Sequence, residues 1–190
     1  LALSLVRRAN GRVDGFIVES PIAGGHNAPP RGPQVVNEHG EPQYGPRDAV
    51  DLSKMRALDR PFWLAGGMGS ADGLRAALEA GAAGIQVGTA FALCDESGLR
   101  ADLKAQMRAI ALSGQALVRT DPKASPTRFP FKVAQVPGTL SDPALRAARP
   151  RICDLGYLRE AYRRDDGTTG FRCPAEPVNV YVSKGGREED

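Results

Sequence analysis

The sequence predicts an α/β fold with a parallel sheet, and three observations support that prediction. Short apolar segments alternate with amphipathic, helix-like segments through residues 1–91, as in folds built from βα units. A loop that contains glycine follows each apolar segment directly. The chain has 190 residues, 42% of them hydrophobic and 25% charged, which is the composition of a globular protein with one core.

The first third of the chain is expected to hold two helices and one strand. Residues 1–9 predict a helix that ends at Asn10-Gly11, residues 13–18 predict a strand, and residues 48–58 predict a short helix. Residues 27–47 are rich in proline, glycine and polar types and show no periodicity. Long ordered loops of this kind usually form lids or binding loops.

The clearest βαβ unit spans residues 61–91. Residues 62–65 are an apolar run, as expected of a strand covered on both faces. Residues 70–80 carry an apolar stripe at helical spacing and begin at Ser70, a residue type that caps helix N-termini. Residues 84–87 predict the next strand. The unit has the length of about 30 residues that is typical of a βαβ motif.

Two small turns follow the strands of this unit, Gly66-Gly67 after the first and Gly88-Thr89 after the second. Glycine has no Cβ, so a phosphate can approach the main-chain N–H groups, and the Thr89 hydroxyl adds a donor. In eight-stranded β/α barrels a phosphate site is often built from the loops after the last two strands. The alternative is that these glycines only allow tight turns. The spacing is not the dinucleotide-binding GxGxxG pattern.

The second half of the chain changes in character after a helix predicted over residues 102–113. Frequent X-Pro pairs in residues 114–190 disfavour long helices. Within this segment we expect a helix over residues 154–164 and a short strand over residues 178–182. The predicted domains are therefore residues 1–113 and a Pro-rich extension, residues 114–190, to which we assign no chemistry.

The composition indicates which partners to expect. The 25 basic and 22 acidic residues are intermixed, with a net charge of +3, so no nucleic acid or membrane partner is predicted. Cys94, Cys153 and Cys173 are widely spaced without a CxxC pair, which predicts free thiols, a cytoplasmic location and no metal site. Cys94 is expected to be buried, and His39 to be exposed. The chain does not begin with Met, and we expect it to be part of a longer protein.

Three motifs give the chain a family resemblance: AGGH at 23–26, AGGM at 65–68 and GIQVGTAF at 84–91. In this order they resemble the nitronate monooxygenase family, formerly called 2-nitropropane dioxygenases. The resemblance implies an FMN-dependent (β/α)8 TIM barrel, of which residues 1–113 would form the last three βα units. A whole barrel takes about 250 residues, so the earlier strands would lie outside this chain.

The resemblance also implies roles for individual residues. His26 would face the flavin as a catalytic base, because an imidazole of near-neutral pKa can take a proton from the carbon next to a nitro group. A loop histidine is otherwise more often only solvated. Gly24 and Gly25 would approach the flavin. The FMN phosphate side would be held by Gly66 and Gly67 after one strand, and by Gln86, Val87, Gly88 and Thr89 around the end of the next.

The expected function is an FMN-dependent oxidoreductase that oxidises alkyl nitronates or nitroalkanes with molecular oxygen. One alternative is a related FMN-dependent enoyl-(acyl carrier protein) reductase that uses NAD(P)H. Another is a non-catalytic fragment that binds flavin or phosphate. Three strands cannot close a barrel, so we expect the outer strands to pair with missing chain or with another copy, as in a homo-oligomer. We also expect this piece alone to bind FMN weakly.

Overall fold

A parallel sheet organises the N-terminal half of the protein. The computed structural model describes residues 1–33, 35–122, 124–125, 129–150 and 159–188. The sheet contains β1 (Phe16–Glu19), β2 (Phe62–Ala65) and β3 (Gly84–Gln86) in that order. Both pairings are parallel, with Val18 opposite Leu64 and Leu64 opposite Ile85. The predicted parallel α/β arrangement is therefore confirmed for this part of the chain.

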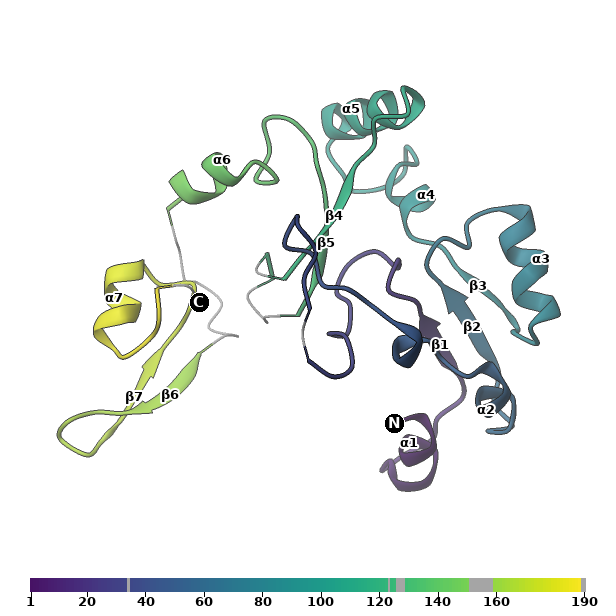
Figure 1. Cartoon of the computed structure of the whole chain (residues 1–190), viewed down its shortest axis with the longest axis horizontal. Helices are drawn as coiled ribbons and strands as arrows, with labels where there is room; N and C mark the ends of the chain where they lie inside the picture. Colours follow the sequence, from purple (N-terminus) through teal and green to yellow (C-terminus); the bar gives the residue numbers. More distant parts are fainter. Residues whose placement is uncertain (34, 123, 126–128, 151–158, 189–190) are drawn as a thin grey trace.

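A helix precedes each strand of the sheet, as the alternation predicted. These helices are α1 (Ala2–Arg8), α2 (Leu52–Arg56) and α3 (Ala71–Glu79), and a 3₁₀ helix (Pro46–Asp48) lies shortly before α2. Figure 1 shows α3 beside β3, with α1 and α2 near one end of the strands. The successive helices and strands thus form the βα units that the sequence predicts.

The helix side of the sheet carries the core. Phe62 on β2 is 2% exposed and packs in a cluster with Met55 of α2 and Ala77 of α3. Partly buried residues of all three strands join this cluster: Phe16, Val18, Leu64 and Ile85. Burying these side chains removes apolar surface from water, and this stabilises the packing of the helices against the strands.

The opposite side of the sheet is less covered. Ile17, which lies between the core residues Phe16 and Val18, is 54% exposed. Successive strand residues point to opposite faces, so Ile17 lies on the face turned away from the helices. The ring of Trp63 lies against the main chain of the neighbouring strands: a Cβ on Gly15 or Gly84 would be 2.8 or 3.1 Å from it. This face carries Ile17, Trp63 and Ala65 together with the polar Glu19 and Gln86, and it is only partly buried.

Local signals set the limits of the helices. The Ser70 hydroxyl accepts a hydrogen bond from the Gly73 N–H at 3.0 Å, which confirms the predicted cap of α3. Gly81, just beyond α3, has a φ of +85°, a conformation that favours glycine. Asp51 caps α2 in the same way by accepting from the Ser53 N–H at 3.0 Å.

The connection from β3 to the rest of the chain is held by a buried lysine. This connection contains α4 (Thr89–Ala92) and α5 (Ala101–Leu112). Lys104 of α5 is 5% exposed, and its ammonium donates to the carbonyl oxygens of Cys94 and Asp95 at 3.0 and 2.9 Å. Cys94 itself is only half-buried and its thiol donates to the Phe91 carbonyl, so the prediction that it is buried was wrong.

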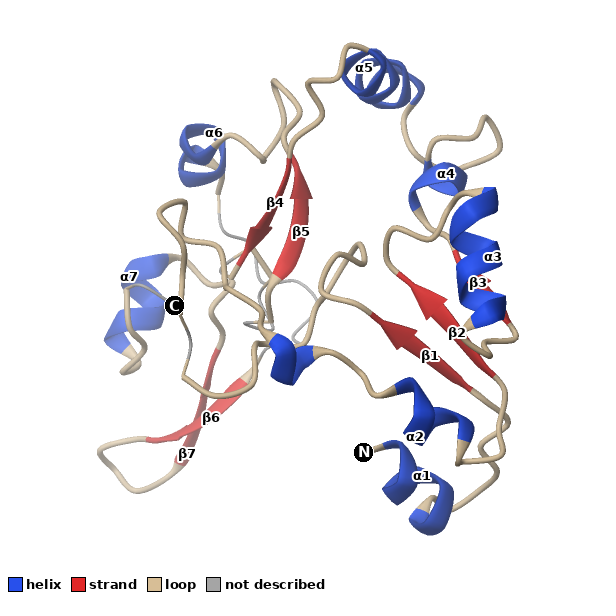
Figure 2. Cartoon of the chain, turned by 45° about the vertical axis from the view of Figure 1, so that its right-hand side comes forward, coloured by secondary structure: helices blue, strands red, loops and turns tan. Residues whose placement is uncertain are grey.

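An antiparallel hairpin covers the loop that follows β1. It consists of β4 (Val118–Asp121) and β5 (Phe131–Ala134), and it lies between the parallel sheet and the C-terminal part in Figures 1 and 2. The Asn27 N–H donates to the Pro130 carbonyl at 2.7 Å, and the Lys132 N–H donates to the Gly25 carbonyl at 2.9 Å. The hairpin is therefore joined to the β1 loop by main-chain hydrogen bonds.

The last part of the chain holds α6 (Pro143–Ala148), the hairpin β6 (Glu160–Arg163) and β7 (Thr169–Arg172), and α7 (Val178–Ser183). The helix predicted over residues 154–164 was wrong where it can be judged, because residues 160–163 form a strand. Gly167, with a φ of +81°, and the Asp166 carboxylate, which accepts from the Thr168 N–H, make a hairpin turn there. Residues 151–158 lie outside the described part of the chain.

The strand predicted over residues 178–182 was also wrong, because these residues begin α7. Alternating valines favoured a strand by their spacing. Tertiary packing decides otherwise: Tyr181 is 1% exposed, and a Cβ on Gly186 would clash with its ring. Packing of one large side chain overrides the weak preference of β-branched residues for strands.

Among the described residues, no helix combines the length and the apolar character needed to cross a bilayer. The exposed position predicted for His39 is confirmed, since its side chain is 70% exposed.

Glu41 couples the hairpin to the 27–47 loop in a way that depends on pH. Its carboxylate accepts a hydrogen bond from the Thr120 N–H at 2.7 Å, and mainly for this reason its pKa is lowered, although burial opposes the shift. A carboxyl with a lowered folded-state pKa stabilises the fold above its unfolded pKa, and this contribution disappears as the pH falls through the folded pKa.

We therefore expect Glu41→Gln to be less stable than the wild type at neutral pH, with a difference that shrinks on acidification. Urea unfolding at several pH values between about 3 and 7 measures this. Glu79→Gln, at an exposed position of α3, is the matched control and should change little. A constant difference at all pH values would contradict the predicted role of the charge.

Candidate functional site

Three loops meet at the carboxyl edge of the parallel sheet. They follow β1 at residues 20–27, β2 at residues 66–70 and β3 at residues 87–89. Figure 2 shows the strands side by side and running in the same direction, so these loops leave from one edge. This edge is where ligands bind in parallel α/β sheets, and it brings the predicted glycine-rich turns together.

The loops after β1 and β2 are in direct contact at Gly66. Its φ is +100°, and a Cβ there would be 2.2 Å from the Ser20 hydroxyl and 2.8 Å from the Ala23 nitrogen. No other residue type fits without moving the β1 loop, because real Cβ atoms do not approach main-chain atoms so closely. Gly66 therefore sets how close the two loops lie.

Two further glycines, Gly67 and Gly69, bring the β2 loop close to the β1 loop and to the loop after β3. Gly67 has a φ of +69°, and a Cβ on it would lie 2.8 Å from the side chain of Ile22 in the β1 loop. A Cβ on Gly69 would lie 3.2 Å from Val87, which follows β3. The β2 loop thus lies between the other two, and Gly67 and Val87 are on the same side of the molecule.

Two of the predicted glycines, Gly24 and Gly88, differ from these. Gly88 has a φ of −112°, which any residue can adopt, and Gly24 is also outside the left-handed region. No described atom lies within 4 Å of the position that a Cβ would take at either residue. Gly25 has a φ of +81°, so its own conformation accounts for the glycine. Nothing in the described fold requires glycine at 24 or 88.

Main-chain donors beside these glycines remain available. None of the hydrogen bonds between described residues uses the N–H groups of Gly67, Gly88 or Thr89. Gln86, whose register partner is Ala65, and Thr89 are both exposed. The edge therefore offers several unused donors at positions where an anion can reach the main chain.

His26 lies in the β1 loop, but its described contacts are with the hairpin. The ring Nε2 is 2.6 Å from the Ser125 hydroxyl oxygen. The ring also meets Phe131 edge to face, with centroids 4.7 Å apart and an interplanar angle of 81°. A β-bridge joins residues 26 and 131. The imidazole is thus held by the hairpin, while Gly24 and Gly25 connect it to the glycine edge.

Sequence reasoning did not find Ser125 and Phe131. Both lie in residues 114–190, which the sequence predicts to be an extension without chemistry, and Ser125 is 99 residues from His26. The X-Pro pairs of this segment, among them Ser125-Pro126, predict only that long helices are disfavoured. No local pattern connects such distant positions, so only the folded chain could reveal the contact.

Two buried polar atoms of the β1 loop lack a partner within the described part of the chain. They are the Ser20 hydroxyl oxygen and the Asn27 side-chain oxygen. The Asn27 amide nitrogen, by contrast, donates to the Ala23 carbonyl at 3.1 Å. Buried polar groups usually have partners, so this loop retains unused hydrogen-bonding capacity.

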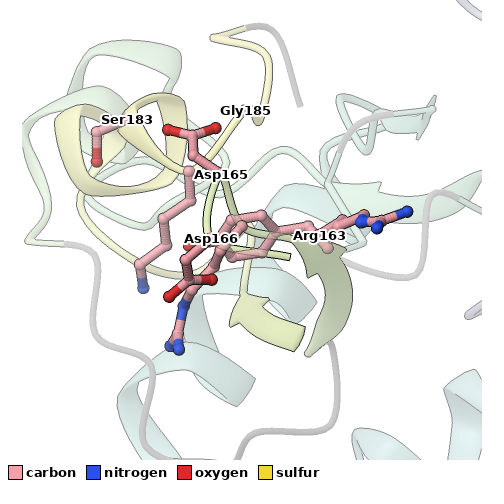
Figure 3. A pocket seen from close by; sticks show the side chains of 8 residues that line it. Arg163, Asp165, Asp166, Ser183 and Gly185 are labelled. Atoms are coloured by element: carbon pink, nitrogen blue, oxygen red, sulfur yellow. The ribbon is translucent and has the colours of Figure 1, made fainter. Parts of the chain in front are cut away.

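A hollow of about 480 Å³ lies elsewhere, between the β6–β7 turn and α7. Figure 3 shows Arg163, Asp165, Asp166 and Ser183 around it. Its lining carries both signs of charge and includes none of the residues predicted for the site. We therefore place the candidate site at the glycine edge. Among the described residues, no group of three or more His, Cys, Asp or Glu could hold a metal ion.

Comparisons with known proteins agree with the position of the glycine motifs. A family model described as nitronate monooxygenase matches residues 4–128, which include β1 to β4 and the loops of the candidate site. A nitronate monooxygenase of Pseudomonas aeruginosa is 36% identical over 107 residues, which are 56% of this chain and 27% of that protein. The matched part thus spans about a quarter of that relative's length. No solved structure matches the chain significantly.

The contact at Gly66 predicts a strong effect on stability. We expect Gly66→Ala to lower the free energy of unfolding by about 2–4 kcal/mol, because the added Cβ clashes with main-chain atoms and the backbone conformation is unfavourable for alanine. Denaturant unfolding followed by circular dichroism measures the loss. Gly98→Ala is the control, since no described atom lies within 4 Å of that Cβ. Equal stability of the two variants would refute the role of the contact.

Proposed function

Because this chain belongs to the nitronate monooxygenase family, we propose that it forms part of an FMN-dependent oxidoreductase that oxidises alkyl nitronates or nitroalkanes with molecular oxygen. The observation that carries the proposal is that Gly24 and Gly88, where the described fold leaves the main chain bare without a structural need, both lie in loops at the carboxyl edge of the parallel sheet. Close approach of a ligand explains such glycines at the edge where ligands bind.

The same proposal assigns the parallel sheet to a (β/α)8 barrel. Helices cover one face of the sheet, as they cover the outside of such a barrel. The other face, which carries the half-exposed Ile17, would then point into the barrel interior. Further strands from a longer chain, or from a second copy, would pair with the outer strands β1 and β3 and cover that face. Residues 1–113 would belong to the barrel.

The residues at the glycine edge fit FMN. Its phosphate would meet the unused N–H groups of Gly67, Gly88 and Thr89, which lie on loops that touch each other. Gln86, Val87 and the Thr89 hydroxyl would border this phosphate side, and Gly66 would keep the two loops close. Gly24 and Gly25 would allow the flavin ring to approach the main chain. The bound flavin would supply the redox chemistry.

His26 would act on the substrate. A neutral nitroalkane must lose a proton from the carbon that bears the nitro group, and an imidazole can accept that proton near neutral pH. A nitronate has already lost it, and His26 would then hydrogen-bond the substrate instead. In this proposal the glycine loops would bind and position the FMN, while His26 would exchange the proton with the substrate carbon.

The cofactor part of the proposal can be tested with alanine substitutions. In the full-length protein that carries this chain, we expect Gly24→Ala and Gly88→Ala to weaken FMN binding by about tenfold or more, because each Cβ would project where the ligand approaches. Flavin fluorescence titration measures the dissociation constant. Both variants should keep wild-type stability, since neither Cβ meets a described atom within 4 Å.

Gly45→Ala is the matched control for this experiment. Gly45 has a φ of −130°, and no described atom lies within 4 Å of its Cβ position, but it is remote from the site in sequence. Normal FMN binding is expected for this variant. If Gly24→Ala and Gly88→Ala also bind FMN like the wild type, the assigned flavin position is wrong.

The reaction can be tested with the flavin spectrum of the full-length protein under anaerobic conditions. We expect propionate 3-nitronate to reduce the bound flavin, and NADH alone to leave it oxidised. His26→Ala should lower kcat/KM for a neutral nitroalkane by about 100-fold or more, because it removes the proton acceptor. Rapid bleaching by NADH without a nitronate would instead favour the reductase alternative. An unchanged rate in His26→Ala would favour flavin binding without this catalysis.

A further inference from the structure

One contact between described residues that the proposed function does not use joins His26 to Ser125. The ring Nε2 and the serine hydroxyl oxygen are 2.6 Å apart, a short hydrogen-bond distance. Ser125 is 5% exposed, so its hydroxyl is held in a largely dry environment. Neither the family match nor the chemistry proposed above gives Ser125 a role.

The surroundings fix the imidazole on this side. Phe131 packs edge to face against the ring, and the main-chain hydrogen bonds from Asn27 to Pro130 and from Lys132 to Gly25 bracket the His26 backbone. The ring is therefore confined by the hairpin and directed towards Ser125. A ring held in one orientation presents its second nitrogen in one direction.

A neutral imidazole has one protonated and one unprotonated nitrogen, and its hydrogen bonds decide which is which. Nε2 is engaged with Ser125, and no hydrogen bond between described residues uses Nδ1, so Nδ1 is the nitrogen left to accept a proton from a substrate. Nδ1 can do this only if it is unprotonated, and the proton must then reside on Nε2. The Nε2–H group would donate to the hydroxyl oxygen of Ser125.

We propose that Ser125 is a positioning residue that holds His26 in the Nε2–H tautomer and leaves Nδ1 as the basic nitrogen of the site. This inference rests on the proposed function of His26 as a base, and it adds a residue of the 114–190 segment to the site. The hairpin β4–β5 is then part of the machinery, because its connecting segment carries the hydroxyl that orients the base.

Nuclear magnetic resonance of the 190-residue chain, labelled with ¹⁵N-histidine, tests the tautomer without flavin or turnover. The chain has only two histidines, and His39→Gln assigns them. At about pH 8.5 an unperturbed histidine is neutral, and the ¹⁵N shifts then report which nitrogen carries the proton. We expect His26 to be almost entirely in the Nε2–H form.

In Ser125→Ala the ratio of the Nε2–H to the Nδ1–H form of His26 should fall towards that of the exposed His39, because the ring loses the hydroxyl that accepts from Nε2–H. Ser125→Thr keeps a hydroxyl and should restore the wild-type ratio. Ser113→Ala is the matched control, because the hydroxyl of Ser113 binds only the Ile110 carbonyl among its described contacts. His39 serves as an internal reference that should not change.

Two results would overturn the proposal: a wild-type spectrum with His26 mainly in the Nδ1–H form, or an unchanged ratio in a folded Ser125→Ala variant. The wild-type spectrum decides the assignment even if Ser125→Ala does not fold. Failure of the proposed function is a separate result, because it appears as absent flavin binding or absent nitronate oxidation in the full-length protein, whatever the tautomer of His26.

Discussion

The close approach of the β2 loop to the β1 loop at Gly66 is the constraint on which the candidate site depends. A Cβ on Gly66 would lie 2.8 Å from the Ala23 nitrogen, which is too close for any side chain. Because the loops touch there, the glycines that follow β2 lie next to the segment that carries His26. Gly69, which would touch Val87 if it had a Cβ, extends the same close packing to the loop after β3. Three loops from three strands thereby form one edge of the molecule.

Two different structural elements build the candidate site. The parallel sheet supplies the glycine-rich turns, while the hairpin β4–β5 supplies the environment of the histidine. Main-chain hydrogen bonds at Gly25 and Asn27 join the two parts. In the function that we propose, the main chain of the edge would bind the FMN phosphate, and distant side chains would orient the base. The match to the family model covers both β4 and the three loops of the edge.

The sheet and the glycine edge could be predicted because their signals are local. The apolar run at 62–65 and the cap at Ser70 each act on adjacent residues, and the structure has both. Other features depend on burial or on contacts between distant residues, which local patterns do not reveal. The alternating valines of 178–182 form a helix because Tyr181 is buried, and Ser125 meets His26 across 99 residues. Periodicity contains no information about such pairs.

The long separation between His26 and Ser125 also has a consequence for the order of folding. A contact between residues that are 99 positions apart costs more chain entropy than local contacts do. We therefore expect the βαβ units to form before the hairpin packs against them. Few hydrogen bonds join the hairpin to the β1 loop. Segments attached in this way have a smaller free energy of local opening than the core has. Amide hydrogen exchange would then be faster around the histidine than in β2. The hairpin contact can thus open while the parallel sheet stays folded.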